Sequence, residues 1–213
     1  MVQSLGTKVT TKISKSHVVE ETSAANENGY YEIVYTEAEL RYRYANSDDV
    51  ASGCYEEDIR YNIQKLIDAE SPISKHRLCK KIMQSFGIAR MGDRLSGYMD
   101  HLLAKEGLRS TIVGGDVFYW KSFFSLAEYK TFRKRFDREP LDIAPEEVSN
   151  AICKILLDQG SLPEEELIKY LAKLFGFGSV RDIVFKAMHR GLLCGIKSGR
   201  IEKIGGRIKI KNI

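Results

Sequence analysis

The sequence has no apolar run of the roughly 18 residues that a membrane-spanning helix needs. Its N-terminus also lacks the charged start, apolar stretch and small-residue cleavage site of a secretory signal peptide. The four cysteines are widely spaced and form no CxxC pair, so we expect no disulfide framework in a chain of this size. These absences predict a cytoplasmic protein with reduced cysteines and no membrane contact.

Motifs for catalysis are missing as well. The nearest approach to a phosphate-binding loop, Gly191 to Ser198, has the wrong spacing and falls on an expected hairpin. His76 and Cys79 lie one helical turn apart, but no second pair completes a zinc site. Glu128-Tyr129-Lys130 has the Glu-x-Lys spacing of some metal nucleases, yet no acidic residue on a preceding strand accompanies it. We therefore expect no enzyme activity, no cofactor and no metal.

What the sequence does contain is one pattern that occurs twice, 89 residues apart. At this offset the apolar residues of one copy align with apolar residues of the other, and the alignment needs no gap. Ile59, Ile63, Leu66, Ile67, Leu78, Ile82 and Phe86 correspond to Val148, Ile152, Ile155, Leu156, Leu167, Leu171 and Phe175. Shared spacing over some forty residues is typical of a repeated supersecondary unit.

Each copy predicts three helices and a β-hairpin. In the first copy the apolar residues of the first and third helices recur at i, i+4, i+7 and i+8, which is the helical period. Ser74 fits the N-cap of the second helix, and Gly87 fits the left-handed position that ends it. Gly114-Gly115 lies between two β-rich runs and predicts a hairpin turn. Three helices followed by a hairpin indicate a helix-turn-helix core with a wing.

The fold class that we predict is α+β and mainly helical, with tandem winged-helix (helix-turn-helix plus β-hairpin) repeats. The predicted segments are a disordered arm or linker at 1–29, a short strand and lead-in at 30–57, winged helix 1 at 58–120, an amphipathic, partly helical bridging segment at 121–144, and winged helix 2 at 145–213. In the second copy we expect the third helix over about residues 179–190, shorter than in the first copy, and a longer hairpin.

Charge is unevenly distributed along the chain. Residues 1–57 hold five basic and ten acidic residues, while residues 190–213 hold seven basic residues and Glu202 alone. A basic end favours contact with a polyanion. The alternative is a solvated hairpin whose lysines keep an edge strand soluble.

A second pattern lies at Arg41-Tyr42-Arg43-Tyr44, where aromatic and basic residues alternate. Such residues can stack on the bases of a single strand. Packing of the tyrosines against a neighbouring domain is the explanation that we favour.

Candidate nucleic-acid contacts lie on the third helices and the hairpins, because in helix-turn-helix proteins the third helix enters the major groove and the wing contacts the backbone. In the first copy they are Arg90, Arg94, Lys105 and Arg109. In the second copy they are Arg181, Lys186, Arg190, Lys197, Arg200, Lys203, Arg207, Lys209 and Lys211, of which the last six belong to the expected hairpin. Asp93 and Asp100 weaken the basic character of the first copy.

The residues that carry a family resemblance are Pro72-Ile73, Phe86 to Arg94, Phe118 to Trp120, Ile143 to Glu147 and Leu174 to Phe177. Over roughly residues 35–212 the chain resembles an uncharacterised bacterial family, the domain of unknown function 3320. That family commonly ends large superfamily-one helicase-like proteins, often behind a restriction-endonuclease-like domain. The resemblance implies a nucleic-acid context and an ATP-dependent helicase as parent or partner. Neither a motor nor a nuclease is present in this chain.

Three functions remain open. The first is a non-catalytic accessory module that holds duplex or single-stranded nucleic acid, in keeping with a DNA context. The second is a protein-interaction module that docks on a superfamily-one helicase or nuclease domain, in cis or in trans. The third is a structural role in dimerisation, for which no particular feature argues.

Overall fold

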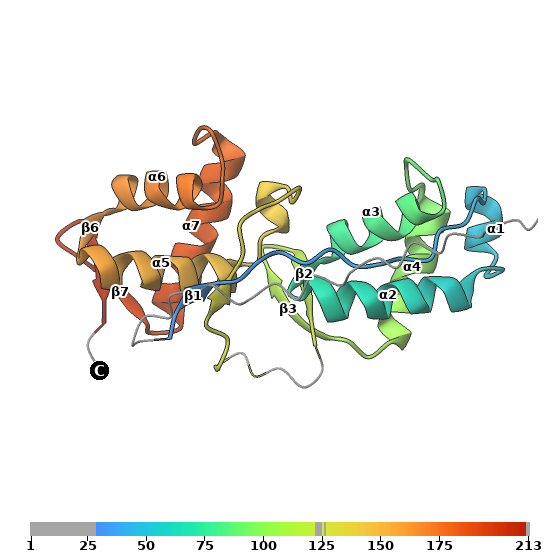
Figure 1. Ribbon diagram of the computed structural model, residues 1–213, viewed down its shortest axis with the longest axis horizontal. Coiled ribbons are helices and arrows are strands. Elements are labelled where there is room, and N and C mark those ends of the chain that lie inside the picture. The colour runs from blue at the N-terminus through green and yellow to red at the C-terminus, as the bar shows by residue number, and fades with distance from the viewer. Residues whose placement is uncertain (1–28, 122–124, 126, 212–213) are drawn as a thin grey trace, which may run out of the picture.

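The structure is a computed structural model that describes residues 29–121, 125 and 127–211. It is α+β and mainly helical, as predicted, with seven α-helices and eight short strands in these residues. Figure 1 shows two units side by side along the long axis of the molecule, with the segment from β1 to α1 running across both. None of the described helices is long and apolar enough to span a membrane. The predicted arm at 1–29 lies almost wholly outside the described residues, as does Leu126 of the bridging segment.

The first unit contains four helices and one small antiparallel sheet. Its elements are α1 (Ser47–Ala51), α2 (Glu56–Glu70), β2 (Ile73–Ser74), α3 (Lys75–Ser85), α4 (Asp93–Lys105), β3 (Arg109–Val113) and β4 (Asp116–Trp120). β4 pairs with both other strands, which gives the order β2-β4-β3. The hairpin turn is Gly114-Gly115, as predicted, and both glycines have positive φ.

The second unit has the same order of elements. They are α5 (Pro145–Gln159), β6 (Leu162–Pro163), α6 (Glu164–Leu174), α7 (Asp182–Lys197), β7 (Ile201–Ile204) and β8 (Arg207–Ile210). The sheet order β6-β8-β7 repeats that of the first unit. Adding 89 to the bounds of α2, β2 and α3 gives those of α5, β6 and α6 without a shift. Ile73 pairs with Tyr119, and Leu162 pairs with Ile208 at the same offset.

Local signals set the helix ends. The side chain of Ser74 accepts a hydrogen bond from the backbone N–H of Arg77, which caps α3. Gly87 and Gly176 follow the last residues of α3 and α6 with φ of +75° and +86°, a conformation that side chains with a Cβ rarely adopt. Pro145 starts α5, where its missing N–H is not needed.

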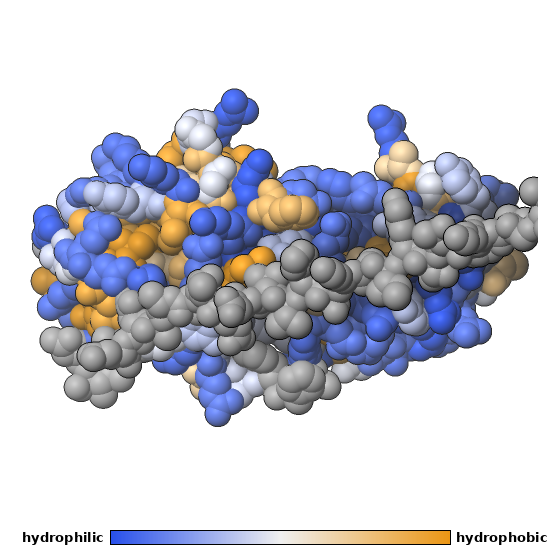
Figure 2. Space-filling view, in the orientation of Figure 1, coloured by the Kyte–Doolittle hydropathy of each residue, from blue (hydrophilic) through white to orange (hydrophobic). Residues whose placement is uncertain are grey.

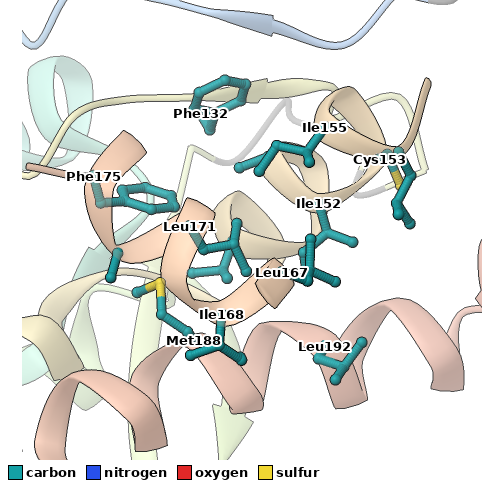
Figure 3. Close-up of a cluster of buried hydrophobic side chains, with 14 of the residues drawn as sticks. Phe132, Ile152, Cys153, Ile155, Leu167, Ile168, Leu171, Phe175, Met188 and Leu192 are labelled. Atoms are coloured by element: carbon teal, nitrogen blue, oxygen red, sulfur yellow. The ribbon is translucent and has the colours of Figure 1, made fainter. Parts of the chain in front are cut away.

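Two separate hydrophobic cores stabilise the two units. Ile63, Leu78 and Met99 lie in the first core, and the residues 89 positions later, Ile152, Leu167 and Met188, lie in the second. All six side chains are at most 1% exposed. Figure 3 shows the second core, where side chains from α5, α6 and α7 point toward one another and Phe132 covers them.

The prediction for the third helix and hairpin of the second unit is wrong. α7 has 16 residues and α4 has 13, so the third helix is longer in the second unit. The strands of its hairpin have four residues instead of five. No strong breaker stops the helix before Ser198-Gly199, and the helix therefore takes up Lys197, which was predicted to lie on the wing.

The described residues of the bridging segment are extended apart from short turns and one 3-10 turn, and the helix expected around Tyr129 and Phe132 does not form there. Within it β5 (Thr131–Phe132) pairs in parallel with β1 (Tyr31–Glu32), and a single 3-10 turn, η1 (Pro140–Asp142), follows. The amide of Asn150 donates to two carbonyls of the segment, at 2.9 and 3.1 Å. Tertiary hydrogen bonds of this kind satisfy the extended backbone and override a helical spacing of apolar residues.

In each unit, a segment that precedes the first long helix, α2 or α5, binds that helix through arginines. Two arginines from the segment bind the acidic residue three positions into that helix. The pairs are Arg41 and Arg43 with Asp58, at 3.2 and 3.0 Å, and Arg133 and Arg138 with Glu147, at 2.9 and 2.6 Å. Asp58 and Glu147 are equivalent at the 89-residue offset. The arginines themselves do not keep the 89-residue offset, but the equivalent helices begin at Glu56 and Pro145, two residues before the predicted start of the first copy at residue 58.

The alternation of arginine and tyrosine at residues 41–44 follows from this arrangement. The two arginines face Asp58, whereas Tyr42 and Tyr44 are 70% and 97% exposed. These two tyrosines are not packed against a neighbouring unit, contrary to the explanation favoured from sequence. The ring of Tyr44 lies over Gly87, where a Cβ would come within 3.3 Å of it.

Candidate nucleic-acid interface

A buried charge network lies where the two units meet. Glu70, at the end of α2, accepts hydrogen bonds from Arg77 and Lys81 of α3, both at 2.9 Å, and from the hydroxyl of Tyr35. Arg77 also donates to Asp137 of the bridging segment at 2.6 Å. Burial by itself raises the pKa of Glu70, but these hydrogen bonds and charges outweigh it, so that the pKa is lowered.

Arg133 joins this network to the second unit. Its guanidinium donates to Glu147 of α5 at 2.9 Å, and to the backbone carbonyls of Glu70 and Pro72 at 2.9 and 3.0 Å. Arg138 binds the other oxygen of Glu147 at 2.6 Å. Each cation of the network is bound to at least one partner inside the protein, so we assign the network a structural role.

The predicted contacts of the first unit are only partly available to a ligand. Arg94 is exposed but pairs with Asp48 at 3.0 Å, and Asp100 pairs with Lys75 at 2.7 Å. Arg90, Lys105 and Arg109 are exposed. Asp93, in the first turn of α4, adds a negative charge to this surface.

The second unit presents its free cations on α6, α7 and the turn between them. Arg181 and Lys186 are exposed and have no ion pair among the described residues. The same holds for Lys169 and Lys173 on α6, which were not among the predicted contacts. The sequence could have indicated them, because the helix before the turn also approaches the backbone in helix-turn-helix proteins.

The hairpin of the second unit is basic, but several of its cations have partners inside the protein. Lys203 pairs with Glu164 at 2.5 Å, and Lys209 pairs with Glu202 at 3.2 Å. Arg207 donates to the hydroxyl of Ser161 at 3.0 Å. Lys211 is exposed at its base. Ion pairs at the surface contribute little, and phosphates can replace such carboxylates.

Arg200 and Arg190 have structural partners. Arg200 donates to Asn150 and Ser149 of α5, at 2.6 and 3.0 Å. Arg190 turns toward the first unit, where it pairs with Asp116 at 2.6 Å, and its side chain is only 10% exposed. Arg190 and Arg200 were predicted to contact nucleic acid together with the surface cations. In the structure, partners inside the protein hold both of them.

The outward face of α7 also carries apolar side chains at helical spacing. Phe185, Leu193 and Ile196 are 44%, 52% and 37% exposed, and Phe185 stacks on His189 with ring centroids 5.5 Å apart. In Figure 2, apolar side chains gather among hydrophilic ones over the second unit. The sequence analysis did not single out this apolar face.

A cavity of about 710 Å³ lies between α3, the β3–β4 turn, η1 and the start of α7. Apolar side chains, including Met83, Met91 and Ile183, form one part of its wall. Polar and charged side chains, among them His76 and Lys80, line it as well. Sequence reasoning could not find this cavity, because residues from both units line it.

Comparison with known families gives one match. Residues 48–97 match the model of the family described as "Protein of unknown function (DUF3320)". The match runs from α1 into α4 and confirms the predicted resemblance over this segment, which is shorter than the expected 35–212. None of the curated proteins compared with the chain matches it.

Proposed function

With residues 48–97 assigned to the family DUF3320, we propose that the chain is a pair of winged helices whose second unit binds nucleic acid through its backbone. The order of three helices and a hairpin, with a short strand that completes the sheet, supports the winged-helix assignment for both units. The proposed role is that of a non-catalytic accessory module.

One observation carries the proposal. Residues 167–211, which cover most of α6, all of α7 and the hairpin, contain eleven basic residues and only Asp182 and Glu202 as acids. Five of the cations, on α6, at the turn and on α7, are exposed and have no ion pair among the described residues; they are Lys169, Lys173, Arg181, Lys186 and Lys197. A phosphate backbone that crosses α6 and α7 neutralises these cations and releases counterions.

The composition of this surface favours binding to the backbone over reading of bases. Four of these five cations are lysines, which neutralise phosphates as point charges, whereas specific base contacts are most often made by arginine. The apolar residues on the outward face of α7 offer no hydrogen bonds to base edges. We therefore expect weak discrimination among sequences.

The test is fluorescence anisotropy on short duplex and single-stranded probes at several salt concentrations. Affinity should fall as salt rises, with a slope of about −0.9 in log–log form for each phosphate neutralised in a duplex. The double variant Lys173→Ala, Lys186→Ala should flatten the slope by up to about 1.8, and should weaken all sequences alike.

The matched control is Lys65→Ala, Lys134→Ala, which removes two lysines elsewhere on the surface and should leave the slope unchanged. If the control flattens the slope as much as the test variant, the second unit is not the binding surface. No binding by the intact chain at about 50 mM salt would refute the proposal.

The apolar face of α7 supports a second candidate, a protein-interaction module. Exposed apolar patches on a helix often mark contacts between proteins. In the context implied by the family resemblance, the partner is a superfamily-one helicase or nuclease domain. The variant Leu193→Ser should then abolish partner binding, while nucleic-acid affinity is kept.

A further inference from the structure

Three possible metal ligands meet at the mouth of the cavity between the units. His76 belongs to the first turn of α3, while Glu139 is the N-cap of the 3-10 turn η1 and Asp142 is its last residue. Their nearest ligand atoms all lie within 4.8 Å of one another. One imidazole and two carboxylates are the kinds of ligand that zinc accepts in proteins.

The distances suit a shared ion. His76 Nδ1 and Asp142 Oδ1 are 3.1 Å apart and form a direct hydrogen bond, which an ion bound between them replaces. Two ligand atoms at about 2.0–2.1 Å from one tetrahedral ion lie roughly 3.3 Å from each other. Asp142 is nearly buried and held in place, whereas the side chains of His76 and Glu139 are 63% and 52% exposed. The two exposed side chains can therefore adjust while Asp142 fixes the position.

Hydrogen bonds inside the protein hold the Asp142 carboxylate in place. One oxygen accepts from the hydroxyl of Ser74, and the other accepts from the backbone N–H of Glu139 at 3.3 Å. Partners of this kind orient a ligating carboxylate and are typical of metal sites. The backbone hydrogen bond also caps η1, so Asp142 serves the fold whether or not an ion is bound.

We propose that His76, Glu139 and Asp142 bind one Zn²⁺ ion, with water in a fourth position facing the cavity. All three residues line that cavity, which gives the ion a route from solvent. Cys79 lines it too, but burial raises the pKa of its thiol to about 11, and a protonated thiol is a poor ligand.

Lys80 competes with the ion. Its ammonium group lies 2.7 Å from Glu139 Oε1, and its side chain is 47% exposed. Zinc binding requires this ammonium to swing into solvent, and removal of its charge should therefore strengthen binding. An increase in zinc affinity when the Lys80 charge is removed distinguishes a metal site from a cluster whose residues only support the fold.

The experiment is calorimetric titration of the full chain, without a histidine tag and after treatment with a chelator, with zinc chloride. We expect one site per chain. His76→Gln and Glu139→Gln should each weaken binding by at least about tenfold, since three ligands become two. Both residues are exposed, so the variants should keep the wild-type circular dichroism spectrum. Lys80→Met should tighten binding.

The controls are His101→Gln and Glu165→Gln, which change exposed residues outside the cavity and should leave the affinity unchanged. Cobalt chloride provides a second readout, because a four-coordinate ion at this site absorbs visible light and the spectrum should vanish in His76→Gln. Unchanged affinity in His76→Gln, weaker binding in Lys80→Met, or no saturable binding by the wild type would each overturn the proposal.

Discussion

Glu147 shows how one residue couples burial to charge. It is fully buried in α5, and both of its oxygens are bound by arginines from the bridging segment. Burial by itself raises the pKa of this carboxyl, but Arg133 and Arg138 outweigh that effect and lower the pKa. The folded state therefore stabilises the ionised form of Glu147.

Glu147→Gln should lower the free energy of unfolding at pH 7 by about 3–5 kcal/mol, because two buried guanidinium groups lose their counter-charge. Since the folded pKa is lowered, the stability from this group is present above the unfolded pKa of about 4.3 and is lost as pH falls through the folded value. The variant should therefore lose less stability than the wild type on acidification. Urea unfolding from pH 7 to pH 3 measures both effects. Glu165→Gln, at an exposed site on α6, should change neither.

At the scale of elements, the contact of α7 with α5 depends on two glycines one turn apart. A Cβ built on Gly191 would lie 2.2 Å from Cβ of Val148, and one on Gly195 would lie 2.7 Å from the hydroxyl of Ser149. These glycines belong to the stretch that had been compared with a phosphate loop. Their role is close helix packing, and it explains why α7 continues past them.

Gly191→Ala should lower the free energy of unfolding by roughly 1–3 kcal/mol, because the added methyl group overpacks the contact with Val148. Gly97→Ala on α4 is the matched control. No atom lies within 4 Å of the added Cβ there, so the better helix propensity of alanine should raise stability by up to about 1 kcal/mol. Thermal unfolding compares the two variants, and effects of the same sign would contradict this account.

At the scale of the whole molecule, Arg133 connects the units. Its hydrogen bonds reach the carbonyl of Glu70 at the end of α2, the carbonyl of Pro72 just after that helix, and the carboxylate of Glu147 on α5. The two hydrophobic cores are separate, so contacts between the units are needed to couple their unfolding. The buried network predicts a single cooperative transition for the intact chain.

Arg133→Met should separate that transition into two, because methionine fills similar space but leaves Glu147 and two buried carbonyls without a donor. Differential scanning calorimetry measures the number of transitions. Lys134→Met, at the neighbouring exposed position, should keep one transition. A single transition in Arg133→Met would show that other contacts suffice to couple the units.

The sequence by itself determined the two units and their register. The apolar period, the Ser74 cap and the positive-φ glycines act within a few residues, and a local pattern fixes local structure. The same patterns gave a wrong helix for the bridging segment, where Tyr129 and Phe132 have helical spacing. Hydrogen bonds from β1 and Asn150 hold that backbone extended instead.

Only the tertiary structure decided which charges are free and which groups meet. Arg94, Arg190 and Arg200 looked equivalent to Lys186 in the sequence, yet each has a partner brought close by the fold. His76 lies more than sixty residues from Glu139 and Asp142, and no spacing rule joins them. The physical reason is that hydrogen bonds and Coulomb interactions depend on the distance between two groups in space. The number of residues between them along the chain does not determine that distance.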